Sequence, residues 1–312
     1  MKVYTDSTKF ADMMVFGACW RQCSTAAVTP EIRQLLSEVF AERTVFEAEV
    51  QGVQRWQYLL VSENSHRSQY DLLIEQRRLG HHIPDGVLCL SGAGSGLHGL
   101  RQRPWAAEAG NIHLSVHLRP DKLVVDSGIP FMVLAAVSVI DAIDSVPGLE
   151  TRAGVKWVND ILLEGAKVAG VLAYTEGAGK SIDAAVLGIG LNVETTPAIE
   201  GTPFVPKVGS VRDFVSDPDS CRQGTVFQAL LGALDLNYRM LQDGQKSELI
   251  ERYRERSVVV GKEVRVCVDD ASSPSKTIAE GKVKNIGDNL ELYLAGRDAP
   301  VTRGRLILES EN

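Results

Sequence analysis

The longest apolar stretch of the chain, from Ile129 to Ile143, limits most strongly what the chain can fold into. Pro130, Ser138 and Asp141 interrupt this stretch, and a membrane-spanning helix needs about 20 predominantly apolar residues. We therefore expect a buried helix over residues 128–146. Enough apolar material is present to cover it, since 44% of the 312 residues are hydrophobic.

Segments with strand character lie on both sides of this helix. Ile112, Leu114, Val116 and Leu118 alternate with polar residues, which predicts a strand whose polar face looks into a cleft. The same criteria predict further strands at residues 45–50, 56–61, 87–90, 153–158, 167–174 and 183–193, and helices at 30–40, before Gly80, at 225–241 and at 246–256. The fold class is therefore α/β (α+β), with a mixed sheet flanked by helices.

The character of the sequence changes at Ser257. From there, short apolar runs alternate with Gly, Asp-Asp and Asn breaks, which predicts a small β-barrel over residues 257–312. Residues 56–256 then form the main domain, and residues 1–55 an extension whose role stays open: it could cover the sheet edge, form part of a dimer interface or dock a carrier. Residues 194–209 are rich in Thr, Pro and Gly and are expected to form a loop.

The charge balance excludes a broad electrostatic surface for nucleic acid or anionic membrane. The chain has 33 Lys and Arg against 40 Asp and Glu, so any anionic ligand must be bound by a few placed cations. The polar N-terminal residues lack the apolar core of a signal peptide, which favours a cytoplasmic location. Five scattered cysteines without a CxxC pair favour a reducing compartment and no zinc site.

A glycine cluster, Gly92 to Gly99, follows one of the predicted strands directly. Backbone N–H groups at glycine can approach a phosphate or carboxylate closely, because no Cβ intervenes. The spacing Gly94-x-Gly96-x-x-Gly99 matches the dinucleotide fingerprint, but the residues that follow have no helical period. We therefore reject a Rossmann interpretation and keep a ligand-binding loop and a simple turn as alternatives.

Two further motifs place polar groups beside predicted strands. KWVND at 156–160 forms a turn between two strands, and Lys167 begins the next one. GIGLN at 188–192 lies at a strand end, where its glycines allow close approach and Asn192 carries an amide suited to a base edge.

In this order, the motifs resemble those of the biotin protein ligase family over about residues 56–310. The most specific piece is KWVNDILL followed by KVAGVL, which differs from the family's usual KWPND only at Val158; SEN at 62–64, the glycine loop followed by Trp105, GNIHLS at 110–115 and GIGLN also agree. The resemblance implies a class II synthetase-like catalytic domain and a C-terminal SH3-like barrel. It also implies that biotin and MgATP give biotinyl-5′-AMP, and that a lysine of a biotin carboxyl carrier protein receives the biotin.

The resemblance also assigns expected roles to residues of this chain. The expected catalytic residues are Lys167, Asp160 and Lys156, with no metal ligand set of the protein's own. The expected substrate-binding residues are Ser62, Asn64, Ser91, Gly94, Ser95, Gly96, Gly99, Ser115 and Gly170. The expected nucleotide-binding residues are Trp105, Asn159, Asn192, Arg101 and Arg103. The expected partner is a carrier domain, with no nucleic acid and no membrane, and the sequence leaves a homodimer open.

The loop departs from the family's form, GRGRRG, at its arginine positions, which are Ser95, Leu97 and His98 here. A charge-assisted hydrogen bond to phosphate is worth about 1.5–3 kcal/mol, so the missing arginines matter to nucleotide retention. Arg101 and Arg103, a few residues further on, are the candidates to replace them.

The loop also leaves the identity of the acid open. The position that usually offers a ureido-binding glutamine is Ser91, and SGAGSGLHG resembles the lipoate ligase loop as well. The alternatives are therefore a ligase for lipoate, octanoate or another acid, and a non-catalytic member that binds a small acid or nucleotide.

Overall fold

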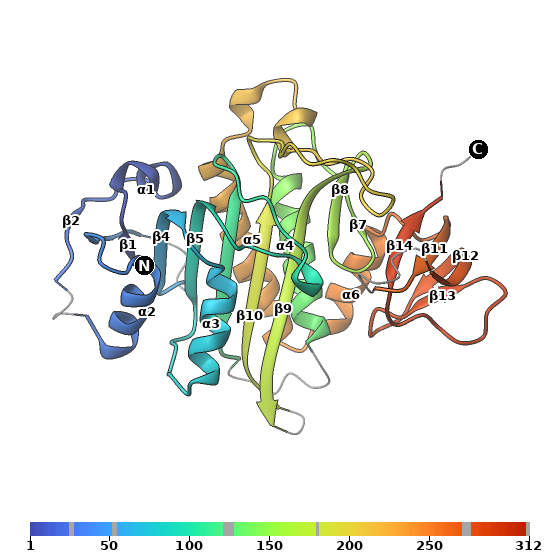
Figure 1. Cartoon of the computed structure of the whole chain (residues 1–312), viewed down its shortest axis with the longest axis horizontal. Coiled ribbons are helices and arrows are strands. Elements are labelled where there is room, and N and C mark those ends of the chain that lie inside the picture. Colours follow the sequence, from blue (N-terminus) through green and yellow to red (C-terminus); the bar gives the residue numbers. More distant parts are fainter. Residues whose placement is uncertain (25–27, 52–54, 121–127, 179–180, 270–275, 310–312) are drawn as a thin grey trace.

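In the computed structural model, which describes residues 1–24, 28–51, 55–120, 128–178, 181–269 and 276–309, one large mixed sheet forms the centre of the molecule (Figure 1). It has ten strands in the order β2-β3-β1-β4-β5-β6-β10-β9-β8-β7. Their bounds are β1 (Lys2–Thr5), β2 (Arg21–Gln22), β3 (Phe46–Glu49), β4 (Tyr58–Ser65), β5 (Val87–Gly94), β6 (Ile112–Leu118), β7 (Ala153–Lys156), β8 (Asp160–Leu163), β9 (Ala166–Ala178) and β10 (Ser181–Leu191). The predicted mixed sheet is confirmed.

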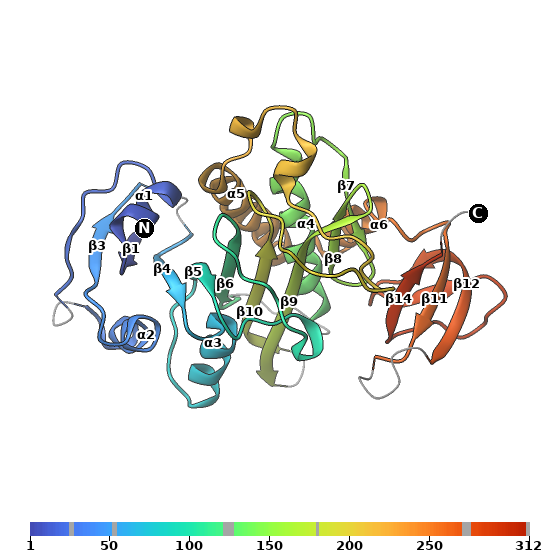
Figure 2. The same ribbon diagram turned by 45° about the horizontal axis from the view of Figure 1, so that its top comes forward.

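Helices cover both faces of this sheet (Figure 2). They are α1 (Thr8–Met14), α2 (Pro30–Phe40), α3 (Gln69–Arg78), α4 (Ile129–Asp144), α5 (Gln223–Gln242) and α6 (Lys246–Glu255). The apolar helix predicted at 128–146 is α4, which packs on β9, β10 and α5 in the larger hydrophobic core, whereas α2 and α3 lie over the second core on the opposite face. None of the helices among the described residues has both the length and the apolar character needed to cross a membrane.

The N-terminal residues belong to the main sheet. β1 pairs in parallel with β4 and antiparallel with β3, so β1, β2 and β3 continue the sheet at the edge of β4, and the strand predicted at 45–50 is β3. Val3 on β1 is fully buried, and it is part of the same core as α4. This pairing agrees with covering the sheet edge, one of the three roles left open for residues 1–55.

The C-terminal strands form a second, antiparallel sheet in the order β13-β12-β11-β14. Its strands are β11 (Glu263–Cys267), β12 (Thr277–Ile286), β13 (Leu292–Leu294) and β14 (Arg305–Leu308). Trp157 donates a hydrogen bond to the Leu290 carbonyl at 2.6 Å, and the Val258 amide donates to the Val155 carbonyl at 3.0 Å, so the loop before β13 and the segment before β11 contact β7 and the turn after it. The closure of this sheet into an SH3-like barrel stays a prediction.

The strand predicted to face a cleft is β6, and two of its polar side chains are buried histidines. Burial lowers the pKa of His113 and of His117 to about 4. Nδ1 of His117 donates to the Pro84 carbonyl at 2.9 Å, which one neutral tautomer satisfies. Both rings are therefore neutral near pH 7.

Replacing Val3 by Asp tests whether the N-terminal strands are part of the main folding unit. An unpaired carboxylate in this core should lower the free energy of unfolding of the whole chain by about 3 kcal/mol or more. Urea unfolding followed by tryptophan fluorescence measures it, with Lys2→Gln, at the exposed neighbouring position, as the matched control. Equal stability of the two variants would contradict the assignment.

The buried histidines predict that stability is lost in acid. Between pH 6.5 and 4 the unfolded chain binds protons at these rings and the folded chain does not, so the free energy of unfolding falls as the pH falls. His117→Asn keeps a donor for Pro84 and should remove up to about 3 kcal/mol of this fall. Urea unfolding at pH 7, 6, 5 and 4.5 measures the difference, and parallel curves for the variant and the unmodified protein would refute the explanation.

Candidate functional site

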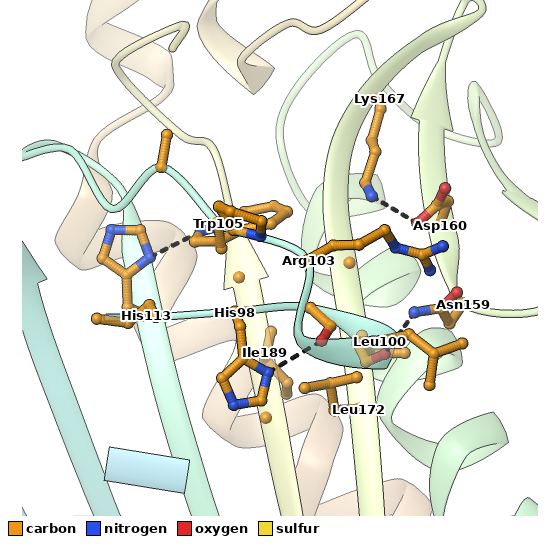
Figure 3. Close-up of a pocket in the computed structure, with 18 of the residues that line it drawn as sticks. His98, Leu100, Arg103, Trp105, His113, Asn159, Asp160, Lys167, Leu172 and Ile189 are labelled. Carbon is orange, nitrogen blue, oxygen red and sulfur yellow. Dashed lines mark hydrogen bonds and ion pairs between the residues drawn. The ribbon is translucent and has the colours of Figure 1, made fainter. Parts of the chain in front are cut away.

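A cleft of about 230 Å³ opens on the face of the sheet that carries α3. Its floor is formed by β6, β10, β9 and β8, and its walls by residues 97–106, by the loop 197–208 and by Arg305 of the C-terminal sheet. Figure 3 shows Trp105, Arg103 and Lys167 converging above the strands. The loop predicted at 194–209 is attached to β9, because the Lys167 amide donates to Lys207 at 2.8 Å and the Gly209 amide donates to Lys167 at 3.0 Å.

The floor of the cleft is a single row of residues that runs across five strands. Ser91 on β5 pairs with His113 on β6, and His113 pairs with Gly190 on β10. Gly190 in turn pairs with Gly170 on β9, and Gly170 pairs with Asp160 on β8. Directly paired residues have side chains on the same face of a sheet, so strand pairing alone brings these positions together.

Trp105 lies against two glycines of this row. A Cβ at Gly190 would come within 2.5 Å of the indole ring, and one at Gly170 within 3.4 Å. The indole Nε1 donates to Nδ1 of His113 at 3.3 Å, and Nε2 of His113 donates to the Glu108 carbonyl at 3.3 Å. The neutral His113 therefore fixes the position of the ring. At Gly190, where the sequence predicted the close approach of a ligand, the group that approaches is the Trp105 side chain.

Residues 97–105 form a hairpin that carries Trp105 into the cleft. The Gly99 amide donates to Arg103 at 2.8 Å and the Trp105 amide donates to Leu97 at 3.0 Å. His98 anchors the hairpin to α3, since its Nε2 is 2.7 Å from the Asp71 carboxylate.

Two of the four glycines of the cluster, Gly92 and Gly94, serve packing. A Cβ at Gly92 would lie 2.7 Å from the Phe10 ring, and one at Gly94 2.7 Å from the Ser65 carbonyl. Gly94, Ser95 and Gly96 are not among the residues that line the cleft, whereas Gly99 is. Gly94 lies within β5, where it pairs with Ser65 of β4. The expected contacts of these three residues with substrate stay a prediction.

Lys167 and Asp160 form an ion pair at the end of the cleft formed by β8 and β9. Their Nζ and Oδ1 atoms are 2.6 Å apart, and each side chain is 20% exposed. The ammonium also lies 5.6 Å from the centre of the Trp105 ring. Asn159 lines the cleft beside them and donates to the Val171 carbonyl at 2.9 Å.

Two arginines, Arg103 and Arg305, add positive charge to the cleft beside Lys167. Arg103 lines the cleft and binds Asp269 at 3.0 Å, whereas Arg101 is exposed, 3.5 Å from the same carboxylate, and is not part of the lining. Arg305 also lines the cleft, stacked 3.8 Å over Phe204, and burial lowers its pKa. No sequence motif singled out Arg305, which reaches the cleft from β14 of the C-terminal sheet.

Lys156 is buried behind the cleft. It pairs with Asp160 in the β7–β8 hairpin, is 5% exposed, and donates to the Phe204 carbonyl. Burial lowers its pKa to about 8. It does not line the cleft, and its contact with Phe204 places it beneath the loop 197–208. Its expected part in catalysis stays a prediction.

Ser62 and Asn64 also lie outside the cleft lining. Ser62 pairs with Ser91 and so extends the floor row by one strand, but its hydroxyl donates to the Asn64 carbonyl at 3.0 Å. Asp6 and Arg43 of the N-terminal segment contact it as well. Because the role of this segment could not be predicted, the sequence could not show that these two positions are covered.

The remaining predicted residues do line the cleft: Ser91, Ser115, Gly170 and Asn192. Asn192 donates to the Gly209 carbonyl at 3.0 Å, and its buried Oδ1 has no hydrogen-bond partner among the described residues. Gln69 and Tyr70, at the start of α3, line the cleft too and were missed, because nothing in a single sequence distinguishes them from other residues in the first turn of a helix.

The cleft can therefore bind an extended molecule with an anionic end and a neutral end. Lys167, Arg103 and Arg305 provide positive charge near Asp160, and uncharged polar groups line the α3 end. Within the described ranges, no group of three or more His, Cys, Asp or Glu side chains is arranged to hold a metal ion.

Comparisons with known proteins point to one family. Residues 83–192 match the model of the biotin/lipoate A/B protein ligase family. The biotin–[acetyl-CoA-carboxylase] ligase of Mycobacterium tuberculosis is 31% identical over 285 residues, which cover 88% of this chain and 98% of that protein. The bifunctional ligase/repressor BirA of Bacillus subtilis is 27% identical over 56% of this chain, but the match spans only 58% of that relative's length.

Among solved structures, biotin protein ligase from Aquifex aeolicus in complex with biotin and ATP has a TM-score of 0.62 and 16% sequence identity, covering 82% of this chain and 100% of that one. At this identity the likeness is one of fold. Together with the relative that matches over almost its whole length, it shows that the chain belongs to the biotin protein ligase family.

Proposed function

We propose that the protein is an ATP-dependent ligase that activates biotin as biotinyl-5′-AMP and transfers the biotinyl group to a lysine of a biotin carboxyl carrier protein. The observation that carries the proposal is the Lys167–Asp160 pair, 2.6 Å apart at the cationic end of the cleft. The Mycobacterium tuberculosis relative, named as a biotin–[acetyl-CoA-carboxylase] ligase, supports the choice of acid and of carrier.

In the first step, a carboxylate oxygen of biotin attacks the α-phosphorus of ATP, the bond to the bridging oxygen breaks, and pyrophosphate leaves. Two anions must meet in line, so cations have to offset their repulsion and the charge that develops. Lys167 would bind the carboxylate and the α-phosphate, and Arg103 and Arg305 would bind the polyphosphate. Arg103 and Arg305 would thereby replace the arginines of the family's glycine loop as cations for the phosphates.

Trp105 and Asn192 would bind the adenine base of ATP. The unpaired Oδ1 of Asn192 is an acceptor for an exocyclic amino group such as that of adenine. Trp105 is half-buried, with one face on Gly190 and Gly170, and adenine would stack on its other face.

Mg²⁺ is expected with ATP, and the residues present fit a metal that arrives bound to the nucleotide. Mg²⁺ in such sites is usually held by one or two carboxylates and the substrate phosphates, and Asp160 is the lining carboxylate next to Lys167 and Asn159. When bound, the metal neutralises phosphate charge. Asp160 would then exchange its contact with Lys167 for the metal.

In the second step, the amine of the carrier lysine attacks the acyl carbon of the adenylate and AMP leaves. The amine loses a proton as the amide forms. Lys167, between the acyl and phosphate groups, would stabilise the leaving phosphate oxygen.

Replacing Lys167 by Ala should abolish adenylate formation. Loss of a preorganised cation at the reacting phosphate costs about 100-fold or more in rate. Biotin-dependent exchange between ATP and pyrophosphate measures the step, and Lys284→Ala, an exposed lysine on β12, is the matched control. Near-normal exchange in Lys167→Ala would refute the mechanism.

Exchange by the unmodified protein with lipoate or octanoate, but not with biotin, would refute the choice of acid, and tight binding of biotin without exchange would identify a non-catalytic member.

Arg101 and Arg103 allow a matched comparison, because both contact Asp269 but only Arg103 lines the cleft. Arg103→Ala should lower kcat/KM for ATP by about 10- to 100-fold, as expected for one charge-assisted hydrogen bond to phosphate. Arg101→Ala, which contacts the same Asp269 from outside the cleft, should change it less than about 3-fold. The same exchange assay at varied ATP measures both variants, and equal effects would show that Arg103 acts only through Asp269.

A further inference from the structure

We infer that Gln69 is the residue that recognises the neutral end of the acid, and that its amide selects a cyclic urea over a dithiolane or a plain alkyl chain. The inference rests on the proposed function, whose loop lacks the glutamine usual in the family. Gln69 is the first residue of α3 and lines the cleft.

The Gln69 amide is buried without a partner. The residue is 4% exposed, and neither Oε1 nor Nε2 has a hydrogen-bond partner among the described residues. Buried amide groups in folded proteins are nearly always paired, and an exception needs an explanation. A ligand that occupies the cleft and offers both a donor and an acceptor supplies one.

The position of Gln69 along the cleft agrees with this role. Its neighbour Tyr70 packs against Gly188, where a Cβ would lie 3.0 Å from the tyrosine ring. Gly188 and Gly190 are two residues apart on β10, so the Tyr70 end and the Trp105 end are separated by about 7 Å along the strand. Lys167 lies beyond Trp105, next to Gly170. A substrate whose carboxylate reaches Lys167 therefore extends its other end toward Gln69.

Gln69 shares this end of the cleft with His98, whose Nε2 lies 2.7 Å from the Asp71 carboxylate. Ser115, paired with Gly188 on the adjacent strand, also lines this end of the cleft. A neutral group with adjacent N–H and C=O fits these side chains, because one amide can accept from the N–H and donate to the C=O. The ureido ring of biotin is such a group. A dithiolane or an alkyl end would leave Gln69 unpaired, and a site built for hydrogen bonding rejects such analogues strongly.

The test compares two buried glutamines on the same helix. Gln76 lies seven residues after Gln69 on α3, is 2% exposed and also has an unpaired Oε1, but it does not line the cleft. Gln69→Leu should raise the Kd for biotin by about 10- to 100-fold, the value of one or two neutral hydrogen bonds. Gln76→Leu should leave the Kd unchanged. Calorimetric titration of the full chain with biotin, without ATP, measures both.

Two further readouts separate recognition from damage to the fold. Gln69→Leu should leave KM for ATP unchanged, should bind lipoate no more weakly than the unmodified protein does, and should melt at the same or a higher temperature without ligand, because an unpaired buried amide is gone. Gln69→Met serves if the leucine variant does not fold. An unchanged Kd for biotin in either folded variant overturns the inference.

The outcomes also separate this inference from the proposed function. If the unmodified protein exchanges pyrophosphate with biotin and Gln69→Leu binds biotin normally, the function stands and the inference fails. If biotin binds through Gln69 but no exchange occurs with any acid, recognition stands and the ligase activity fails. If the unmodified protein binds lipoate or octanoate and not biotin, both fail.

Discussion

The candidate site depends above all on the strand register of the central sheet. Backbone pairing aligns Ser91, His113, Gly190, Gly170 and Asp160 in one row, although almost seventy positions separate the first from the last along the chain. A shift of any one of these strands by a single residue would turn its member of the row to the opposite face. The cores on both faces oppose such a shift, so the energy that stabilises the sheet also positions the chemistry.

Small and neutral residues in this row leave room for larger groups above it. The Trp105 ring lies against Gly190 and Gly170 because neither carries a Cβ, and it is oriented by a histidine that burial keeps neutral. Tyr70 uses Gly188 in the same way. Rings held on rigid strands have little freedom to move, which is what a binding site needs for precise positioning.

Positive charge is concentrated at one end of the cleft, although the chain as a whole is acidic. Lys167 comes from β9, Arg103 from the hairpin and Arg305 from β14, so the C-terminal sheet completes the site. Unpaired amide atoms of Gln69 and Asn192 remain elsewhere in the same cleft. Natural proteins tolerate such local costs mainly at functional sites.

The sequence alone predicted the fold class, α4, most strands of the main sheet, and the motifs that supply Lys167, Asp160, Asn159 and Asn192, because periodicity and short motifs are local properties. It did not predict β1 or the pairing of β1 with β4, since a four-residue strand carries little periodic signal. Only the tertiary structure showed that Ser62 and Lys156 are covered, that Gly94 serves packing, and that Arg305 and Gln69 enter the cleft. These outcomes depend on which distant segments pack together, and that is decided by long-range pairing and burial rather than by any residue's neighbours in the chain.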